Sequence, residues 1–142
     1  MAELNNSVAS LRILGDDLDP EEITALLGKE PTVAERKGQE ITSGTGAKRV
    51  AQSGRWSFHS DSRTPGDLDN QITELLNGTS DDLAVWNDLA VRFRIDIFCG
   101  LFLLEENEGF SLSPQTLLRI GERGIKLGFD IYAPETTDEP VP

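Results

Sequence analysis

The sequence is poor in the residues from which reactive sites are usually built. Its 142 residues include one cysteine, Cys99, and one histidine, His59. One cysteine cannot form an internal disulfide, and the two residues together would supply only half of a four-ligand zinc site. The sequence contains no Cys-x-x-Cys, His-Glu-x-x-His or nucleophile-elbow pattern. We therefore expect no catalytic residues, no metal site and no cofactor.

Long hydrophobic runs are also missing. The longest, residues 97–104, has the length of a strand and is far shorter than the roughly 20 apolar residues of a membrane span. The first residues contain neither the basic region nor the apolar core of a secretion signal. Because Cys99 lies within an apolar run, its thiol is expected to stay reduced. These features predict a cytoplasmic protein without a membrane partner.

Basic residues are few. Thirteen Lys and Arg against 25 Asp and Glu give a net charge of −12, which disfavours a nucleic-acid partner because like charges repel. The charge is nevertheless uneven, since basic residues outnumber acidic ones between Lys29 and Arg63 and the rest of the chain is strongly acidic. That segment is either a solvated, loop-rich region or a surface that contacts an anion or a partner.

The sequence does contain enough patterned hydrophobicity, 37% of residues, to form a core. Alternating apolar and polar residues predict strands at 8–14, 54–59, 94–104 and 125–132, and more weakly at 31–37. Apolar residues three and four positions apart predict short helices. Their N-caps are predicted from the residues that favour this position, namely Asp19, Asp67, Ser80 and Ser113.

These elements predict an α+β fold over residues 8–133. The expected architecture is a two-layer sandwich, with an about five-stranded, mostly antiparallel sheet and three to four helices in ferredoxin-like βαβ halves. Residues 94–104 are apolar on both sides and are expected at the centre of the sheet, with both faces covered. We expect residues 1–7 to be a disordered N-terminus and residues 134–142 a flexible acidic tail.

Several segments resemble the landmarks of a mostly bacterial family of unknown function, DUF4279. The run from Leu11 to Ile23, LRILGDDLDPEEI, resembles the opening of that family. Three later segments are similar to its other landmarks: Gly54-Arg55-Trp56, Leu83-Ala84-Val85-Trp86, and Arg123-Gly124-Ile125 to Ile131-Tyr132. The resemblance covers about residues 8–133 and implies a small, stand-alone domain. It implies no catalytic or ligand-binding residue.

The polar segment 38–53 contains a glycine-rich stretch, Gly44-Thr45-Gly46-Ala47-Lys48-Arg49. Its spacing matches neither a P-loop nor a dinucleotide-binding fingerprint. A flexible loop with two cations can still bind an anion, whether it forms a hairpin or a mobile flap. The candidate anion-binding residues are therefore Lys48, Arg49, Arg55 and His59.

The acidic run Asp16–Glu22 does not match an EF-hand, because Pro20 and the helical positions that follow break the ligand spacing. Capping of a helix and interaction with its dipole explain these acids more simply. The candidate partner-binding residues are Asp16, Asp17 and Trp56, although Trp56 alternates with Phe58 as a core residue would.

The favoured function is a non-catalytic protein-interaction module of the inhibitor or immunity type. Its acids at 16–22 and 67–88 would attract a basic protein partner. One alternative is a small-molecule or anion-binding protein, or an enzyme, that uses the 38–53 loop region. A further alternative is a homo-oligomer that forms through an uncovered sheet edge.

Overall fold

Three strands with alternating apolar residues form the centre of the fold. In the computed structural model, which describes residues 2–135, β2 (Asn6–Gly15) pairs antiparallel with both β6 (Gly54–His59) and β7 (Arg94–Phe102). The strand β3 (Val33–Glu35) pairs antiparallel with β6, and β9 (Lys126–Tyr132) runs parallel to β7. The sheet order is therefore β3-β6-β2-β7-β9.

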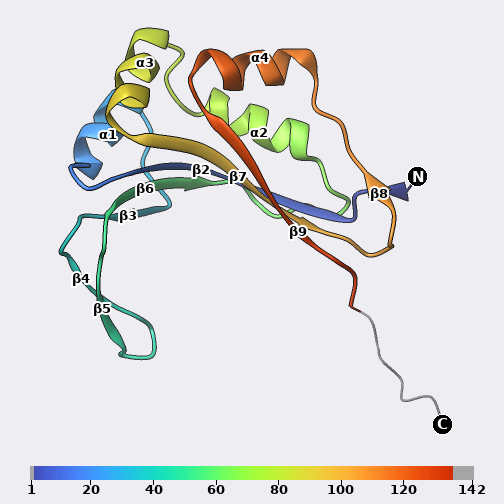
Figure 1. The fold of residues 1–142 in the computed structure, drawn as a ribbon, viewed down its shortest axis with the longest axis horizontal. Helices are drawn as coiled ribbons and strands as arrows, with labels where there is room; N and C mark the ends of the chain where they lie inside the picture. The colour runs from blue at the N-terminus through green and yellow to red at the C-terminus, as the bar shows by residue number, and fades with distance from the viewer. Residues whose placement is uncertain (1, 136–142) are drawn as a thin grey trace.

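All four helices of the described residues lie on one face of this sheet (Figure 1). They are α1 (Pro20–Leu27), α2 (Leu68–Asn77), α3 (Leu83–Arg92) and α4 (Pro114–Glu122). Within residues 2–135, no helix is long and apolar enough to cross a membrane. The other face of the sheet carries no helix, and we call it the open face.

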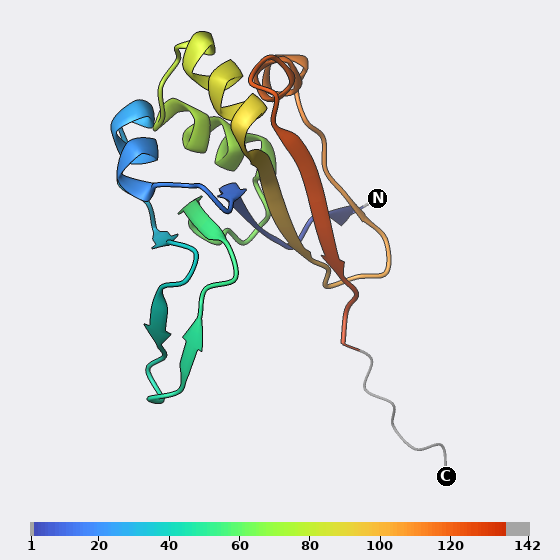
Figure 2. The ribbon, with the colours of Figure 1, turned by 60° about the vertical axis from the view of Figure 1, so that its left-hand side comes forward.

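The remaining strands are short. The strands β1 (Ala2–Glu3) and β8 (Glu108–Gly109) form a parallel pair, and β4 (Glu40–Thr42) pairs antiparallel with β5 (Lys48–Val50). Segment 38–53 is thus a hairpin, one of its two predicted forms. It extends away from the sheet on the side opposite the helices, whereas β9 forms the other edge of the sheet (Figures 1 and 2).

The predicted fold class is confirmed. The sheet has five strands, and three of its four pairings are antiparallel. In the C-terminal half, β7, α4 and β9 form a βαβ unit with adjacent parallel strands. In the N-terminal half, β6 lies between β2 and β3, so this unit is split.

Three of the four predicted N-cap residues are confirmed at that position, and two of them also make the capping hydrogen bond. The Asp19 carboxylate accepts a hydrogen bond from the Glu21 amide at 3.1 Å, and the Ser113 hydroxyl accepts one from the Thr116 amide at 3.2 Å. Asp67 occupies the N-cap of α2 but makes no capping bond with its side chain. Ser80 was predicted to cap α3, but Asp82 does so by accepting from the Ala84 amide at 2.9 Å.

The core lies between the covered face of the sheet and the helices. Both tryptophans are fully buried there, and each satisfies its indole N–H. Trp56 donates to the Thr24 hydroxyl at 3.1 Å, and Trp86 donates to the Ser80 carbonyl at 2.7 Å. The helix-facing side chains of the central strands are also buried: Ala9, Leu11, Ile13, Ile95, Ile97, Cys99 and Leu101.

A buried glutamine connects α2 to the start of β2. The Gln71 amide nitrogen donates to the carbonyls of Ser7 and Asp61 at 2.9 and 2.8 Å, and its oxygen accepts from the Ser7 hydroxyl at 2.5 Å. The same hydroxyl accepts from the Asp67 amide at 3.0 Å. These bonds satisfy the amide of Gln71, which is fully buried and needs partners for both its nitrogen and its oxygen.

Two predictions are wrong, one about disorder of the N-terminal residues and one about burial of both faces of residues 94–104. Residues 2–7, expected to be disordered, contain β1, the first residues of β2 and the buried Leu4, because the Gln71 bonds and core packing hold this segment. Residues 94–104 were expected to be covered on both faces, but Phe98 and Phe102 lie on the open face, since every helix packs on the other. Residues 136–142 of the predicted tail lie outside the described residues.

Replacing Gln71 by leucine should destabilise the fold. The leucine keeps a similar volume but removes the acceptor of the buried Ser7 hydroxyl and one of the donors to the Ser7 and Asp61 carbonyls. We expect the free energy of unfolding to fall by about 1–3 kcal/mol in urea denaturation. The control Asn87→Leu, at an exposed site on α3, should change it by no more than about 0.5 kcal/mol. Equal effects at both positions would contradict this role for Gln71.

Replacing Gly54 by alanine should also destabilise the protein. A Cβ at this position would lie 2.5 Å from the Gly15 carbonyl oxygen and 2.9 Å from the Leu18 Cβ, and neither the backbone nor the packed side chain can yield easily. Overpacking of this kind costs about 1–3 kcal/mol. The matched control is Gly44→Ala, where nothing lies within 4 Å. Thermal unfolding should show a lowered midpoint only for Gly54→Ala.

Candidate functional site

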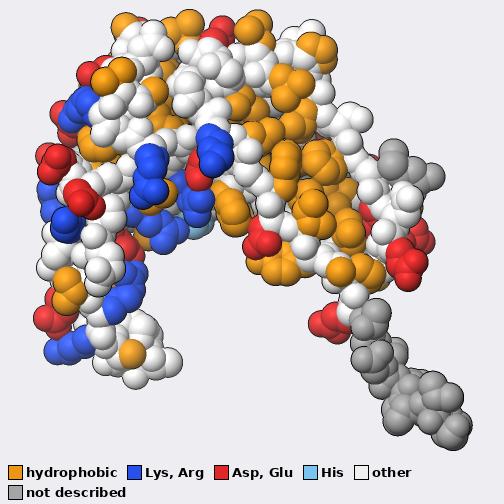
Figure 3. All heavy atoms as spheres, viewed as in Figure 1, with side chains coloured by type: hydrophobic (Ala, Val, Ile, Leu, Met, Phe, Trp, Pro, Cys, Tyr) orange, Lys and Arg blue, Asp and Glu red, His pale blue; other side chains and the backbone are white. Residues whose placement is uncertain are grey.

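The open face of the sheet is the candidate site, and strand register determines which residues it carries. Leu14 of β2 lies opposite Arg55 of β6 on one side and opposite Arg94 of β7 on the other. Glu35 of β3 continues this row next to Arg55. Figure 3 shows Lys and Arg side chains gathered on the underside of the sheet, in the hollow beside the β4–β5 hairpin.

A second row contains an ion pair at the centre of the sheet. Arg12 donates two parallel hydrogen bonds to the Asp96 carboxylate, from Nε at 2.8 Å and from Nη2 at 2.7 Å. Its guanidinium also lies 4.5 Å from the centroid of the Phe98 ring. The bond with Asp96 raises the pKa of Arg12. The pair therefore fixes Arg12 in place and offsets its charge.

The hairpin supplies a further arginine to this face. Arg49 of β5 donates to the Glu35 carboxylate at 2.5 Å, and the Glu35 side chain is only 12% exposed. This contact holds the hairpin against β3 and neutralises the acid that borders Arg55. Lys48, next to Arg49 along the strand, projects to the other side and pairs with Glu40 at 3.3 Å. The structure therefore connects Arg49 with Arg55 but leaves Lys48 on the hairpin.

Neither Arg55 nor Arg94 forms an ion pair with another residue within 2–135. Arg55 donates through Nε to the Ser57 hydroxyl at 2.9 Å, which orients its guanidinium along the open face. We call Arg12, Arg49, Arg55, His59 and Arg94 the basic patch. Within it, Arg55 and Arg94 are the arginines that form no ion pair with an acid of the described residues, and Asp16 lies near enough to Arg94 for their charges to attract.

His59 lies on the same side of β6 as Arg55 and Ser57. Partial burial, together with the positive charge of Arg55, lowers the pKa of His59 below its usual value of 6.5. The imidazole is therefore neutral at pH 7, and its pKa depends on the charge of the patch. An anion that offsets Arg55 would raise this pKa.

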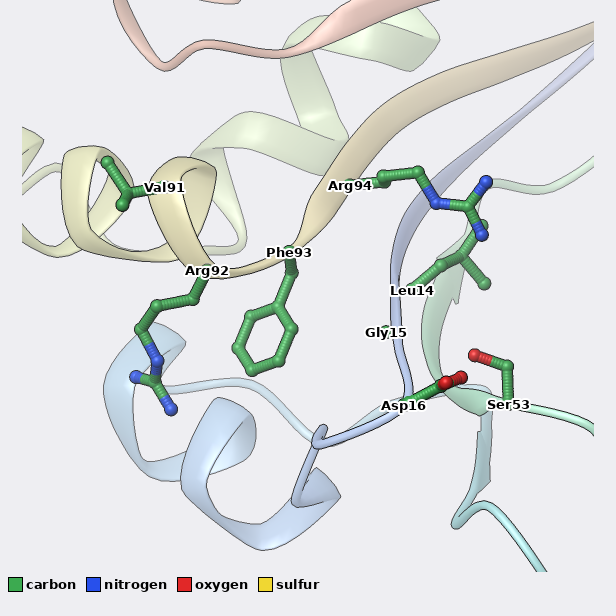
Figure 4. Close-up of a pocket in the computed structure, with 8 residues that line it drawn as sticks. All are labelled: Leu14, Gly15, Asp16, Ser53, Val91, Arg92, Phe93 and Arg94. Carbon is green, nitrogen blue, oxygen red and sulfur yellow. The ribbon is translucent and has the colours of Figure 1, made fainter.

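Two open pockets meet at Arg94. One, of about 470 Å³, includes Leu14, Asp16 and Ser53, and the other, of about 390 Å³, includes Arg12. Both are also lined by Leu14, Phe93 and Arg94. In Figure 4 the Arg94 side chain extends over Leu14, and Asp16 and Ser53 point toward each other across the pocket.

Arg92 lines the first pocket but is engaged elsewhere. Its side chain points toward α1 in Figure 4, and it pairs with Glu22 at 2.5 Å and with Asp88 at 3.1 Å. These bonds raise the pKa of Arg92, with Glu22 the larger cause. Arg94 is thus the cation in this pocket that remains available for a ligand.

Sequence reasoning identified Arg49, Arg55 and His59 but missed Arg12 and Arg94. The alternation of apolar and polar residues along the strands contained the signal for both arginines. Arg12 lies between the core residues Leu11 and Ile13, and Arg94 precedes the core residue Ile95. Side chains at such positions project from the face opposite the core. That the strands carrying them are neighbours became known only from the sheet order.

Most acids of the run 16–22 are paired within the chain. Asp16 accepts from Lys37 at 3.0 Å, and Asp19 and Glu21 both accept from Arg36. The bond from Lys37 is the main cause that lowers the pKa of Asp16. Asp17 is exposed and forms no ion pair with the rest of residues 2–135. Pairing reduces the negative charge that this run presents to a partner.

Trp56 does not contribute to a partner-binding surface. It was a candidate because Arg55 precedes it, but its side chain faces the helices and is fully buried. Cys99 is likewise on the covered face, where burial raises the pKa of its thiol to about 12. At that pKa the thiolate needed for nucleophilic attack is scarce at neutral pH.

Comparison with known proteins assigns the chain to a family. No curated protein and no solved structure matched the chain. A family model described as a domain of unknown function, DUF4279, matches residues 3–134. This range includes all five strands of the central sheet, all four helices and every residue of the basic patch. The chain therefore belongs to the DUF4279 family.

Proposed function

We propose that this protein is a non-catalytic interaction domain that binds an acidic segment of a partner protein on the open face of its sheet. The observation that carries the proposal is the position of Arg55 and Arg94. They flank the apolar Leu14 in one cross-strand row, and no acid within residues 2–135 pairs with either. Two arginines on either side of an apolar residue suit a chain of carboxylates with an apolar contact between them.

The form of the surface favours an extended segment over an enclosed small molecule. Small-molecule sites are concave and bury most of their ligand, whereas both pockets beside Arg94 are open. The hairpin borders this face on one side (Figure 3). Farther along the same face, the rings of Phe102 and Tyr132 stack at 4.7 Å. A bound segment could therefore contact both charged and aromatic side chains.

The chemistry of the described residues supports binding rather than catalysis. The Cys99 thiol is buried with a raised pKa. His59 bonds through its backbone amide to the Thr32 hydroxyl at 3.0 Å, and its lowered pKa comes from burial and Arg55. We also propose that the domain acts in the bacterial cytoplasm, where a buried free thiol such as Cys99 stays reduced.

A basic protein partner is the second candidate, and the net charge of −12 favours it. In the folded chain, however, the acids Asp16, Asp19, Glu21 and Glu22 bind arginine or lysine side chains. The two candidates differ in the sign of the partner's charge, so comparing the binding of an acidic and a basic peptide distinguishes them.

The proposal predicts that an oligo-glutamate peptide binds the full chain and that oligo-lysine binds more weakly. Binding should shift the amide NMR signals of β2, β6 and β7 residues on the open face and should weaken as salt is raised, because the contacts are ionic. Inorganic phosphate serves as the small-anion probe. Binding of phosphate alone would favour the small-anion alternative, and binding of oligo-lysine alone would favour a basic partner.

The double variant Arg55→Gln with Arg94→Gln should lose at least about tenfold in affinity for oligo-glutamate, measured by calorimetry. The matched control is Lys29→Gln with Lys48→Gln, which changes net charge equally. Lys29 lies over the helix-facing Phe58 ring, and Lys48 pairs with Glu40 on the hairpin. Equal losses in both variants would show that only overall charge matters and would contradict a site at Arg55 and Arg94.

His59 provides a pH test because it is the single histidine of the chain. Its NMR titration should give a pKa below 6.5 in the free protein, since burial and Arg55 lower it. His59 therefore binds a proton at a higher pH in the unfolded chain than in the folded chain. Lowering the pH through about 6.5 should accordingly reduce the free energy of unfolding. Bound oligo-glutamate should raise the pKa of His59. An unchanged pKa at saturating peptide would place binding elsewhere.

A further inference from the structure

The strand β9 lies at the edge of the sheet, and its outer side pairs with no other strand within residues 2–135. It is long for an exposed edge strand. The opposite edge strand, β3, has only three residues, whereas β9 has seven and contains no proline. The Leu103 amide donates to the Tyr132 carbonyl at 3.0 Å, so Tyr132 directs its backbone toward β7. Backbone direction alternates along a strand, and Leu127, Phe129 and Ile131 therefore direct their N–H and C=O groups outward. Within residues 2–135 nothing pairs with them.

The side chains along this edge are apolar and exposed. The alternation of apolar and polar residues in 125–132 predicts that Phe129 and Ile131 face the core, but these side chains are 41% and 60% exposed. The prediction is wrong because no helix extends over the C-terminal half of β9. Phe110 packs on Phe129 with ring centroids 5.6 Å apart and is itself exposed. Figure 3 shows hydrophobic side chains gathered over β9, which lies at the front of that view.

The sequence of this edge is complementary to itself. If two copies of β9 pair antiparallel about a two-fold axis at Gly128, Lys126 of each copy lies opposite Asp130 of the other. On the helix side, Leu127 then lies opposite Phe129, and Ile125 lies opposite Ile131. The pairs follow from the KLGFDIY sequence of the strand and the residue before it.

Other registers lose this match. A shift of the axis by one residue in either direction places Lys126 opposite Gly128 or Tyr132, and a shift by two residues places like charges opposite each other at Lys126 or at Asp130. In the register centred on Gly128, the outward backbone groups of Leu127 face those of Phe129 in the second copy, as a hydrogen-bonded antiparallel pair requires. Charge, apolar contact and backbone direction therefore agree on one arrangement.

We propose that the protein forms a homodimer through antiparallel pairing of the two β9 strands, centred on Gly128. The two sheets then join into one continuous sheet, and a two-fold axis perpendicular to it keeps all helices on one side. This inference does not rest on the proposed function, since it is argued from the unpaired backbone, the exposed apolar side chains and the charge order of β9. The second copy supplies the cover that Phe129 and Ile131 lack in the single chain.

Sedimentation equilibrium of the full chain at about 0.15 M salt tests the dimer, because the protein concentration drives self-association. The mass should rise from 15.6 kDa toward twice that value with concentration. Lys126→Asp and Asp130→Lys each place like charges opposite each other twice, and each should weaken the dimer about tenfold or more. A mass that stays at that of the monomer throughout the concentration range would overturn the proposal.

Mixing the two variants gives the most specific test. In a pair of one Lys126→Asp chain and one Asp130→Lys chain, both charge pairs are again opposite in sign, so association should return on mixing. The double variant Lys126→Asp with Asp130→Lys should dimerise by itself, which also serves if a single variant folds poorly. The control Lys48→Asp, on the hairpin, should leave the dimer unchanged. Failure of both the mixture and the double variant to associate would exclude this register.

Discussion

Four helices pack on one face of the five-stranded sheet, and side-chain alternation along each strand then determines what the other face carries. Leu11 and Ile13 are buried because they face the helices, so Arg12 between them must face away from the core. The same constraint places Arg55 beside the buried Trp56. Because no helix covers the open face, it can hold arginines at little desolvation cost. The basic patch is thus a direct consequence of one-sided packing.

Net charge does not describe the charge that each surface of this protein presents. The chain carries −12 overall, yet many acids near α1 are bound to cations of the same chain, as in the contacts of Arg36 and Arg92. On the open face positive charge is in excess, because Asp96 and Glu35 already form ion pairs with Arg12 and Arg49. A partner approaching this face meets Arg55 and Arg94 at short range. At separations beyond about 8–10 Å, salt screens the acids elsewhere on the surface.

Periodicity predicted the elements and the fold class because both depend on local spacing of apolar residues. It could not show which apolar face meets a helix and which meets solvent or another chain. Phe98 and Phe129 illustrate this limit, since both continue an apolar pattern and yet lie outside the core cluster. The prediction of the α3 N-cap failed for a different reason, because Ser80, Asp81 and Asp82 are three successive residues that all favour this position. In the folded chain Asp82 is the N-cap, and the Ser80 carbonyl instead accepts from the Trp86 indole. For the site, Arg55 and His59 lie on one strand and could be grouped by sequence, whereas Arg94 joins them only through sheet order.

The two proposed surfaces are compatible, and the geometry couples them. Lys126 continues the row of Arg12 and Asp96 on the open face. If Asp130 of a second copy binds Lys126, the charge of Lys126 is offset, and the arginines of each copy without an ion pair within residues 2–135 are Arg55 and Arg94. A two-fold axis perpendicular to the joined sheet then places both patches on the same side, separated by the β9 strands. A partner with two acidic segments could occupy both at once, and the second contact would form at a high effective concentration. Weak binding at each patch would then be sufficient for a stable complex, so a single short peptide would underestimate the affinity of the natural partner.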